Sequence, residues 1–206
     1  MQISRLPLRI VRHMQQPSAE ISRLKACLGT MPEAVLNPPL IVLSGLPGSG
    51  KSYFSHQLSQ RLPAAIVESD ALRKCLFPSP TYSAEESARL FDLIHSLIDH
   101  LLAQGVPVIL DATNLAERKR EHLYHIAQRR GAKLVLVRVE APPAAVKARL
   151  EGRERGVNSE DQSEADWQVY QRMRDSAEQI RHPHFAVDTS RDITPVIEKV
   201  LRAVRR

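Results

Sequence analysis

Five short apolar runs recur along the chain, and between most of them lie longer segments whose apolar residues are spaced three or four apart. The runs occupy residues 40–43, 64–67, 106–110, 133–139 and 185–187. Short uninterrupted apolar runs are typical of strands buried on both faces, and the intervening spacing is typical of amphipathic helices. Because strands alternate with helices, the sequence predicts an α/β fold with a five-stranded parallel sheet covered by helices on both faces.

Capping signals define several of the predicted helices. Ser83 and Glu86 form a capping box for a long helix that ends at Gly105. Thr194 is the predicted N-cap of the last helix, with Pro195 at its first position. Further helices are expected at 53–62, at 117–130, from residue 143 onward and at 165–179.

An N-terminal extension precedes the first predicted strand. Residues 1–39 form this extension, and residues 40–206 form the main domain. Within the extension a short helix is expected at 18–29, because Ile21 and Leu24 fall on one helical face. The sequence therefore predicts one α/β domain preceded by a short helical segment.

Composition narrows the class of protein without choosing its function. Of the 206 residues, 43% are hydrophobic and 25% are charged, and no apolar run approaches the roughly 20 residues that cross a bilayer. We therefore expect a globular protein with no membrane partner. A net charge of +6 suits a polyanionic partner and equally an enzyme that binds nucleoside triphosphates. An aromatic content of 4% weighs against a dedicated single-strand nucleic-acid binder.

The two cysteines, Cys27 and Cys75, have no metal-ligand spacing and no second pair. The sequence therefore predicts neither a zinc site nor a disulfide framework, and this cysteine usage favours a reducing, cytoplasmic location. The sequence as a whole does not define an oligomeric state.

The segment 45–52, which reads GLPGSGKS, fits the phosphate-binding loop pattern G-x-x-x-x-G-K-[ST] at each required position. It lies between a predicted strand and a predicted helix, as the motif requires. Glycines let successive backbone N–H groups converge on phosphate oxygens at the helix N-terminus. Lys51 adds a positive charge for the β- and γ-phosphates, and the Ser52 hydroxyl can bind Mg²⁺. We predict that ATP contacts Gly45, Pro47, Gly48, Ser49, Gly50, Lys51, Ser52 and Tyr53.

Polar residues follow two further predicted strands, and the carboxyl ends of parallel strands share one edge of a sheet. Asp70 could accept the proton of an acceptor hydroxyl, although an aspartate here could equally cap the next helix. Arg73 could clamp an acceptor or remain a solvated surface arginine. Asp111 ends an apolar strand, where it would complete the Mg²⁺ shell with Ser52. The sequence thus predicts a catalytic centre at this edge.

Basic residues cluster in two other places. Arg149, Arg153 and Arg155 recur along one helical stretch. They indicate either a lid whose arginines neutralise the charge of a transferring phosphoryl group or a solvated basic face. Arg149 and Arg153, four residues apart, are the favoured catalytic pair. The run 118–120 is predicted to be a solvated helix face.

Two remaining groups are ambiguous or structural. Thr113 and Asn114 either hold their loop in place or contact substrate. Trp167, Tyr170 and Met173, spaced three apart, are predicted to pack a helix rather than to form a base-stacking platform.

Together these segments resemble a family of P-loop kinases. The resemblance rests on the loop 45–52, on 68–73 and 108–114, and on the arginine-bearing helix that leads into 163–170. These segments are similar to those of the AAA-like kinases grouped with the kinase domain of bacteriophage polynucleotide 5′-hydroxyl kinase. The similarity extends from about Leu40 to the C-terminus.

The resemblance implies a P-loop NTPase fold and an ATP- and Mg²⁺-dependent phosphotransferase. It assigns Asp70 as the general base, Arg73 as a ligand of an acceptor phosphate, and Arg153 or Arg155 as the lid arginine. It places Thr189 in the loop beside the adenine. The acceptor stays open between a nucleic-acid 5′ end and a small-molecule hydroxyl. A switch protein or ATPase subunit that phosphorylates nothing is the alternative, and such a protein would need no acceptor base at Asp70.

Overall fold

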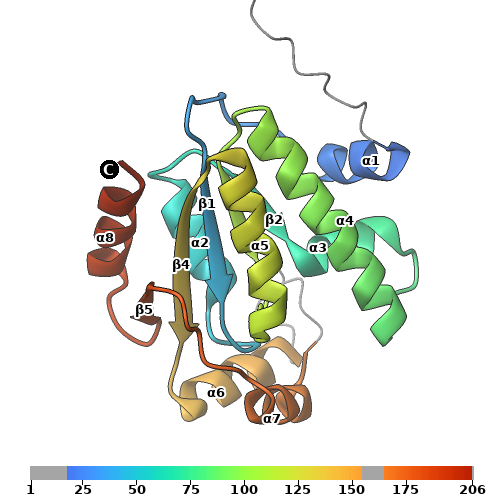
Figure 1. Cartoon of the computed structure of the whole chain (residues 1–206). Coiled ribbons are helices and arrows are strands. Elements are labelled where there is room, and N and C mark those ends of the chain that lie inside the picture. The colour runs from blue at the N-terminus through green and yellow to red at the C-terminus, as the bar shows by residue number, and fades with distance from the viewer. Residues whose placement is uncertain (1–17, 155–164, 206) are drawn as a thin grey trace, which may run out of the picture.

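The computed structural model describes residues 18–154 and 165–205, apart from the side chains of residues 153 and 154. A parallel sheet forms its centre, with five strands in the order β2-β3-β1-β4-β5 (Figure 1). The strands are β1 (Pro39–Ser44), β2 (Ala65–Glu68), β3 (Val108–Asp111), β4 (Lys133–Glu140) and β5 (His184–Asp188). Each strand falls on one of the five apolar runs, and the predicted α/β architecture is confirmed.

The helices are α1 (Ala19–Cys27), α2 (Lys51–Ser59), α3 (Ser69–Leu76), α4 (Ala84–Ala103), α5 (Glu117–Arg130), α6 (Pro143–Glu154), α7 (Trp167–Asp175) and α8 (Thr194–Arg205). The predicted cap of α4 is confirmed, because the Glu86 N–H donates to Ser83 Oγ at 3.1 Å. Thr194 is the first residue of α8 rather than its N-cap, and its N–H donates to Asp192 Oδ1 at 2.9 Å. None of the helices in the described ranges has both the length and the apolar character of a membrane-crossing segment.

Helices cover both faces of the sheet and divide the core into two layers. On one face, α1, α3, α4 and α5 pack over Leu40 and Val42 of β1. On the other face, α2 and α8 pack over Ile41 and Leu43. Alternate residues of a strand point to opposite faces, so a strand covered on both sides must be apolar throughout. This explains the continuous apolar run of β1, in which every residue is buried.

Helix α1 belongs to the core of the first face. Ile21 and Leu24 are buried there, and Lys25 Nζ donates to Gln104 at the end of α4 at 2.7 Å. A disulfide joins Cys27 in α1 to Cys75 in α3. The prediction that the cysteines form no disulfide is therefore wrong, because α1 packs against α3 and brings together two residues that are 48 positions apart. The reducing location inferred from those cysteines loses its support.

The carboxyl ends of the strands meet at one edge of the sheet, and α6 and α7 lie beyond that edge (Figure 1). These two helices pack together through a small cluster formed by Val146, Leu150 and Tyr170. Trp167 stacks on Tyr170 with ring centroids 4.7 Å apart, which confirms the packing role predicted for both residues. Helix α6 is the arginine-bearing helix that the sequence predicts as a lid. Arg155 and the side chain of Arg153 lie outside the described residues.

Candidate active site

The phosphate-binding loop connects β1 to α2. Gly48 and Gly50 have φ angles of +72° and +91°, in the left-handed region that side chains disfavour. A Cβ on Gly50 would lie only 2.8 Å from Thr189 Oγ1. The loop therefore requires glycine at position 50 both for its backbone conformation and for the close approach of residue 189.

The Arg149 guanidinium in α6 bonds both the phosphate-binding loop and the loop after β5. Its Nη1 donates to Gly48 O at 3.1 Å and to Thr189 Oγ1 at 2.8 Å, and its Nη2 donates to Thr189 O at 3.0 Å. Thr189 Oγ1 in turn donates to Ser49 O at 2.6 Å. Arg149 thus connects α6 and the loop after β5 to the phosphate-binding loop, and its predicted catalytic role stays a prediction.

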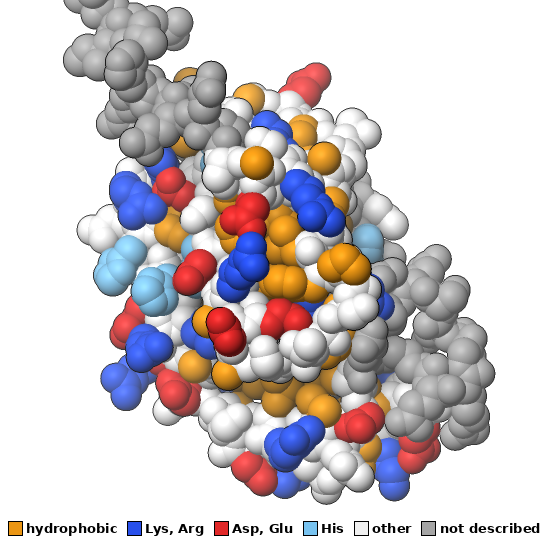
Figure 2. Space-filling model, turned by 90° about the vertical axis from the view of Figure 1, so that its right-hand side faces the viewer, with side chains coloured by type: hydrophobic (Ala, Val, Ile, Leu, Met, Phe, Trp, Pro, Cys, Tyr) orange, Lys and Arg blue, Asp and Glu red, His pale blue; other side chains and the backbone are white. Residues whose placement is uncertain are grey.

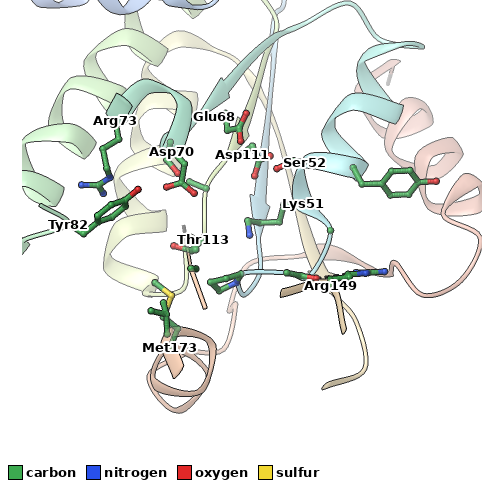
Figure 3. A pocket seen from close by; sticks show the side chains of 18 of the residues that line it. Lys51, Ser52, Glu68, Asp70, Arg73, Tyr82, Asp111, Thr113, Arg149 and Met173 are labelled. Atoms are coloured by element: carbon green, nitrogen blue, oxygen red, sulfur yellow. Dashed lines mark hydrogen bonds between the residues drawn. The ribbon is translucent and has the colours of Figure 1, made fainter. Parts of the chain in front are cut away.

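Lys51 and Ser52 begin α2 and face the end of β3, where Asp111 is buried (Figure 3). Lys51 Nζ donates to Leu46 O at 3.1 Å. The Asp111 carboxylate accepts hydrogen bonds from the hydroxyls of Ser52 and Ser55, the latter at 3.4 Å. Burial raises the pKa of Asp111, and the nearby Lys51 ammonium is the largest influence that opposes the rise.

The oxygen atoms of Ser52 and Asp111 suit Mg²⁺, which prefers hydroxyl, carboxylate, water and phosphate ligands. The described residues contain no cluster of three or more His, Cys, Asp or Glu side chains that could hold a metal alone. Sites of the phosphoryl-transfer type bind Mg²⁺ through one or two protein oxygens together with nucleotide phosphates. The residues present therefore fit a metal that is bound jointly by protein and nucleotide.

Asp70 lies in the first turn of α3, between the phosphate-binding loop and Arg73 (Figure 3). Glu68 is paired with Asp111 in the register of β2 and β3, so three carboxylates gather at this edge of the sheet. Asp70 is partly exposed and lines a cavity with Lys51. The N-cap position of α3 is Glu68 rather than Asp70, which lies in the first turn of the helix.

Arg73 is buried and already has an acidic partner. It forms an ion pair with Glu86, and the two side chains are 7% and 9% exposed. Its Nη2 donates to Ser87 Oγ at 3.3 Å, and its guanidinium carbon lies 4.7 Å from the centroid of the Tyr82 ring. The alternative of a solvated surface arginine is therefore wrong. Because Glu86 balances the charge, Arg73 is also a poor candidate for the main ligand of an acceptor phosphate.

The ion pair with Arg73 persists over the whole pH range of ordinary assays. The Thr81 N–H, and then the Arg73 guanidinium, lower the pKa of Glu86 from an ordinary 4.5 to about 2. A carboxyl whose pKa is depressed in the folded state stabilises the protein above its unfolded-state pKa and loses that contribution as the pH falls through the folded-state value. The pair is therefore fully ionised at neutral pH and is lost only in strong acid.

One cavity of about 900 Å³ extends from the phosphate-binding loop to Asp70 and Arg73. The predicted site residues that line it are Pro47, Gly48, Gly50, Lys51, Ser52, Tyr53, Asp70, Arg73, Asp111, Arg149 and Thr189. Gly45 and Ser49 instead line a second cavity of about 460 Å³, which is bounded by β4, α6 and α7. Their N–H groups donate to Thr113 O and Leu46 O at 3.0 and 3.2 Å. These two N–H groups are thus engaged within the protein, and we assign both residues to the shape of the loop.

Asn114 holds its loop against β1, one of the two roles left open by the sequence. Its φ is +45°, and its Nδ2 donates to Leu43 O at 2.8 Å, immediately before the phosphate-binding loop. Its carbonyl oxygen accepts from Ser44 Oγ at 3.0 Å. Thr113 also lines the large cavity. The structural role therefore explains Asn114, whereas Thr113 combines backbone support with a place on the cavity wall.

Arg120 is the residue that the sequence prediction misplaced. Arg120 is fully buried, whereas Arg118 and Lys119 are exposed as predicted, and Lys119 also lines the large cavity. Arg120 stands three residues before the buried Leu123. Helical spacing alone therefore places Arg120 on the core-facing side, a signal that the basic composition of the run obscured.

Arg120 connects three segments around the site. It donates from Nε to Glu117 Oε2 at 2.8 Å, from Nη1 to Asn114 O at 2.6 Å, and from Nη2 to Gln179 O at 3.0 Å. The bonds link the loop after β3, the first turn of α5 and the segment after α7. A buried arginine with this many partners stabilises the arrangement only while every partner is satisfied.

Replacing Arg120 by methionine should lower the free energy of unfolding by about 2–4 kcal/mol, because buried carbonyl groups and Glu117 would lose their donor. Urea denaturation followed by circular dichroism measures the change. Arg118→Met is the matched control, and as an exposed substitution it should change stability by less than about 0.5 kcal/mol. Equal urea midpoints for the two variants would contradict the connecting role of Arg120.

A glycine-rich loop at the end of the central strand β1, with carboxylates at the end of the adjacent strand β3 and at the end of β2 beyond it, defines a P-loop, kinase-like domain. The chain belongs to the AAA domain family AAA_33, whose model matches residues 40–180. It is 35% identical over 108 residues to the L-seryl-tRNA(Sec) kinase of Methanococcus maripaludis, a match that covers 50% of this chain and 41% of that protein. The chain thus spans about two fifths of the length of this relative.

Solved structures show the same fold. The Mycobacterium tuberculosis APS kinase CysC, in complex with AMPPNP and APS, superposes with a TM-score of 0.61 at 19% identity, covering 82% of this chain and 99% of that one. A gluconokinase from Sinorhizobium meliloti 1021 superposes with a TM-score of 0.57 at 21% identity, covering 82% and 93%. At these identities the two likenesses establish the fold alone.

Proposed function

We propose that this protein is an ATP-dependent kinase that transfers the γ-phosphoryl group to a hydroxyl acceptor. The observation that carries the proposal is the place of Asp70, which opens into the same cavity as Lys51 but comes from a different strand end. A nucleotide-binding switch needs only the donor half of this site. A carboxylate facing the γ-phosphate position from the acceptor side is what transfer to an alcohol requires.

The donor half holds and orients ATP. The N–H groups of the loop at the start of α2, together with Lys51, bind the phosphates. Ser52 and Asp111 would hold Mg²⁺, which when bound offsets the negative charge of the phosphates. Arg149 keeps the loop after β5, with Thr189, against the phosphate-binding loop, and we propose that this loop borders the adenine. Arg153 stays our proposal for the lid arginine that contacts the transferring group.

The acceptor half activates the hydroxyl. The Asp70 carboxylate accepts the hydroxyl proton while the acceptor oxygen forms a bond to the γ-phosphorus and the bond from that phosphorus to the β,γ-bridging oxygen breaks. ADP and the phosphorylated acceptor are the products. The acceptor is a nucleic-acid 5′ hydroxyl or the hydroxyl of a small molecule. The sequence relative L-seryl-tRNA(Sec) kinase is itself a kinase, which supports transfer rather than hydrolysis alone.

Incubation with γ-labelled ATP tests the proposal directly. Two acceptor panels, 5′-hydroxyl oligonucleotides and small alcohols, should show label in at least one acceptor, and ADP should form in equal amount. Formation of ADP and free phosphate without any labelled acceptor would instead identify an ATPase or switch protein.

A further inference from the structure

Two basic side chains on the acceptor side of the large cavity have no acidic partner in the described part of the chain. Lys119 of α5 and Arg172 of α7 line the cavity together with Asp70, and no ion pair between described residues includes either of them. Arg73, in contrast, is paired with Glu86, and Arg149 is bonded to the donor loops. Lys119 and Arg172 thus bring to the cavity two positive charges that no ion pair between described residues includes.

The Lys119 ammonium is held over the cavity wall. Its Nζ lies 4.7 Å from the centroid of the Phe91 ring, and Phe91 also lines the cavity. A cation over an aromatic face is attracted by the negative potential of the ring. This contact keeps Lys119 at the wall while leaving its charge available to a ligand.

Arg172 belongs to the side of α7 that faces the cavity. Val169, Arg172 and Met173 all line it, at the i, i+3 and i+4 positions that share one helical face. Figure 3 shows Met173 on α7, facing the rest of the site. The neighbouring Arg174 does not line the cavity and pairs instead with Asp175 at 3.1 Å.

Apolar side chains line the cavity together with these charges. Phe91, Val169 and Met173 contribute carbon surface to the same cavity. Figure 2, which faces the right-hand side of Figure 1, shows apolar side chains grouped near the middle of this face with basic and acidic side chains around them. An acceptor of purely polar character would leave this surface exposed to water.

We propose that the acceptor carries a phosphate group in addition to its reacting hydroxyl, and that Lys119 and Arg172 bind that phosphate while Asp70 faces the hydroxyl. The inference rests on the proposed kinase function. The inference assigns the acceptor phosphate to Lys119 and Arg172 rather than to Arg73, because Glu86 already balances the charge of Arg73. The phosphate belongs either to a small phosphorylated alcohol or to the backbone of a nucleic acid with a free hydroxyl end.

Acceptor pairs that differ only in a phosphate test the inference. Glycerol is compared with glycerol 3-phosphate, and a nucleoside with its 3′-monophosphate. For the active pair, the wild-type KM should be at least about tenfold lower for the phosphorylated member, as expected for charge-assisted contacts. The double variant Lys119→Met/Arg172→Met should raise that KM by about 10- to 100-fold. The KM values for ATP and for the unphosphorylated member should not change, and kcat should stay within about twofold.

The matched control is Arg118→Met/Arg174→Met, which removes the same charge from positions outside the cavity and should leave every KM unchanged. The inference is overturned if the two double variants have equal KM values for phosphorylated acceptors. It is also overturned if the Lys119/Arg172 variant raises the KM of both members of a pair by the same factor.

An oligonucleotide with a free 5′ hydroxyl separates the two sources of phosphate. If the source is nucleic acid, its wild-type KM should rise steeply with salt, and the slope of log KM against log salt should fall by about 1.4 in the variant, for two lost phosphate contacts to a single strand. If the source is instead a small phosphorylated alcohol, the KM should be lower for that small acceptor than for the oligonucleotide.

Binding separates failure of this inference from failure of the proposed function. If the wild type labels no acceptor, the kinase proposal fails, and the subsite is then measured by equilibrium titration with a fluorescent oligonucleotide whose 5′ hydroxyl is blocked. The subsite predicts at least about tenfold weaker binding by the Lys119/Arg172 variant than by the control variant. The same titration is made with inorganic phosphate, and equal affinity of the two variants for both probes, or binding of neither probe by the wild type, overturns it.

Discussion

Replacement of Asp70 by asparagine should lower kcat for phosphoryl transfer by about 10²- to 10⁴-fold, the usual contribution of a positioned general base. The amide has nearly the shape of the carboxylate but cannot accept the hydroxyl proton. ATP affinity should stay within about twofold, because the residues that we propose to bind the phosphates lie in α2 and the loop before it. Because Asp70 is partly exposed in the first turn of α3, the fold should tolerate the change. Transfer kinetics and an equilibrium titration with ATP measure the two effects separately.

A neutral substitution elsewhere controls for loss of negative charge. Asp92 is exposed on α4 and does not line the large cavity, so Asp92→Asn should have wild-type kinetics. Full turnover by Asp70→Asn with unchanged ATP binding would show that the carboxylate is not the base. Loss of ATP binding together with activity would place Asp70 on the donor side instead.

Lys51→Met should reduce kcat by about 10²- to 10³-fold, as expected when a preorganised positive group near the developing charge is removed. It should also affect the metal site, because Lys51 is the largest influence that opposes the raised pKa of Asp111. Without it, Asp111 would bind a proton at higher pH, and a protonated carboxyl is a poor ligand for Mg²⁺. The Mg²⁺ concentration for half-maximal ATP binding should therefore rise more steeply in the variant as the pH is lowered.

Titration with ATP at several Mg²⁺ concentrations and pH values measures this effect. Lys74→Met is the matched control, since Lys74 is exposed on α3 and does not line the cavity. Identical pH dependence of the Mg²⁺ requirement in Lys51→Met and the wild type would show that the lysine does not influence Asp111. The predicted loss of kcat is tested separately, by measuring transfer rates at saturating ATP and Mg²⁺. An unchanged kcat would contradict it.

The features that the sequence predicts well are those coded within a few neighbouring residues. The central strand is predictable because burial on both faces demands an unbroken apolar run, and the phosphate-binding loop because its backbone demands glycine at fixed positions. Asp70 and Asp111 are predictable as neighbours because Asp111 ends one strand of a parallel sheet and Asp70 closely follows the end of another. In each case local pattern and sheet topology together are sufficient.

Long-range partners could not be predicted in the same way. The capping box suggests that the Glu86 carboxylate bonds the start of its own helix, but it accepts from the Thr81 N–H and pairs with Arg73 of another helix. The choice depends on how α3 packs against α4, which no local spacing encodes. The same holds for Arg120, whose carbonyl partners come from segments on either side of it in the chain.

The disulfide between α1 and α3 has a consequence for where this protein's folding unit begins. The family match starts at residue 40, yet α3, which contains Asp70 and Arg73, is held from outside that range. Arg23 donates to Cys75 O at 2.7 Å beside the Cys27–Cys75 bond. Helix α1, which lies before the family match, therefore supports the helix that contains Asp70 and Arg73. The folded unit is longer than the region that the family model matches.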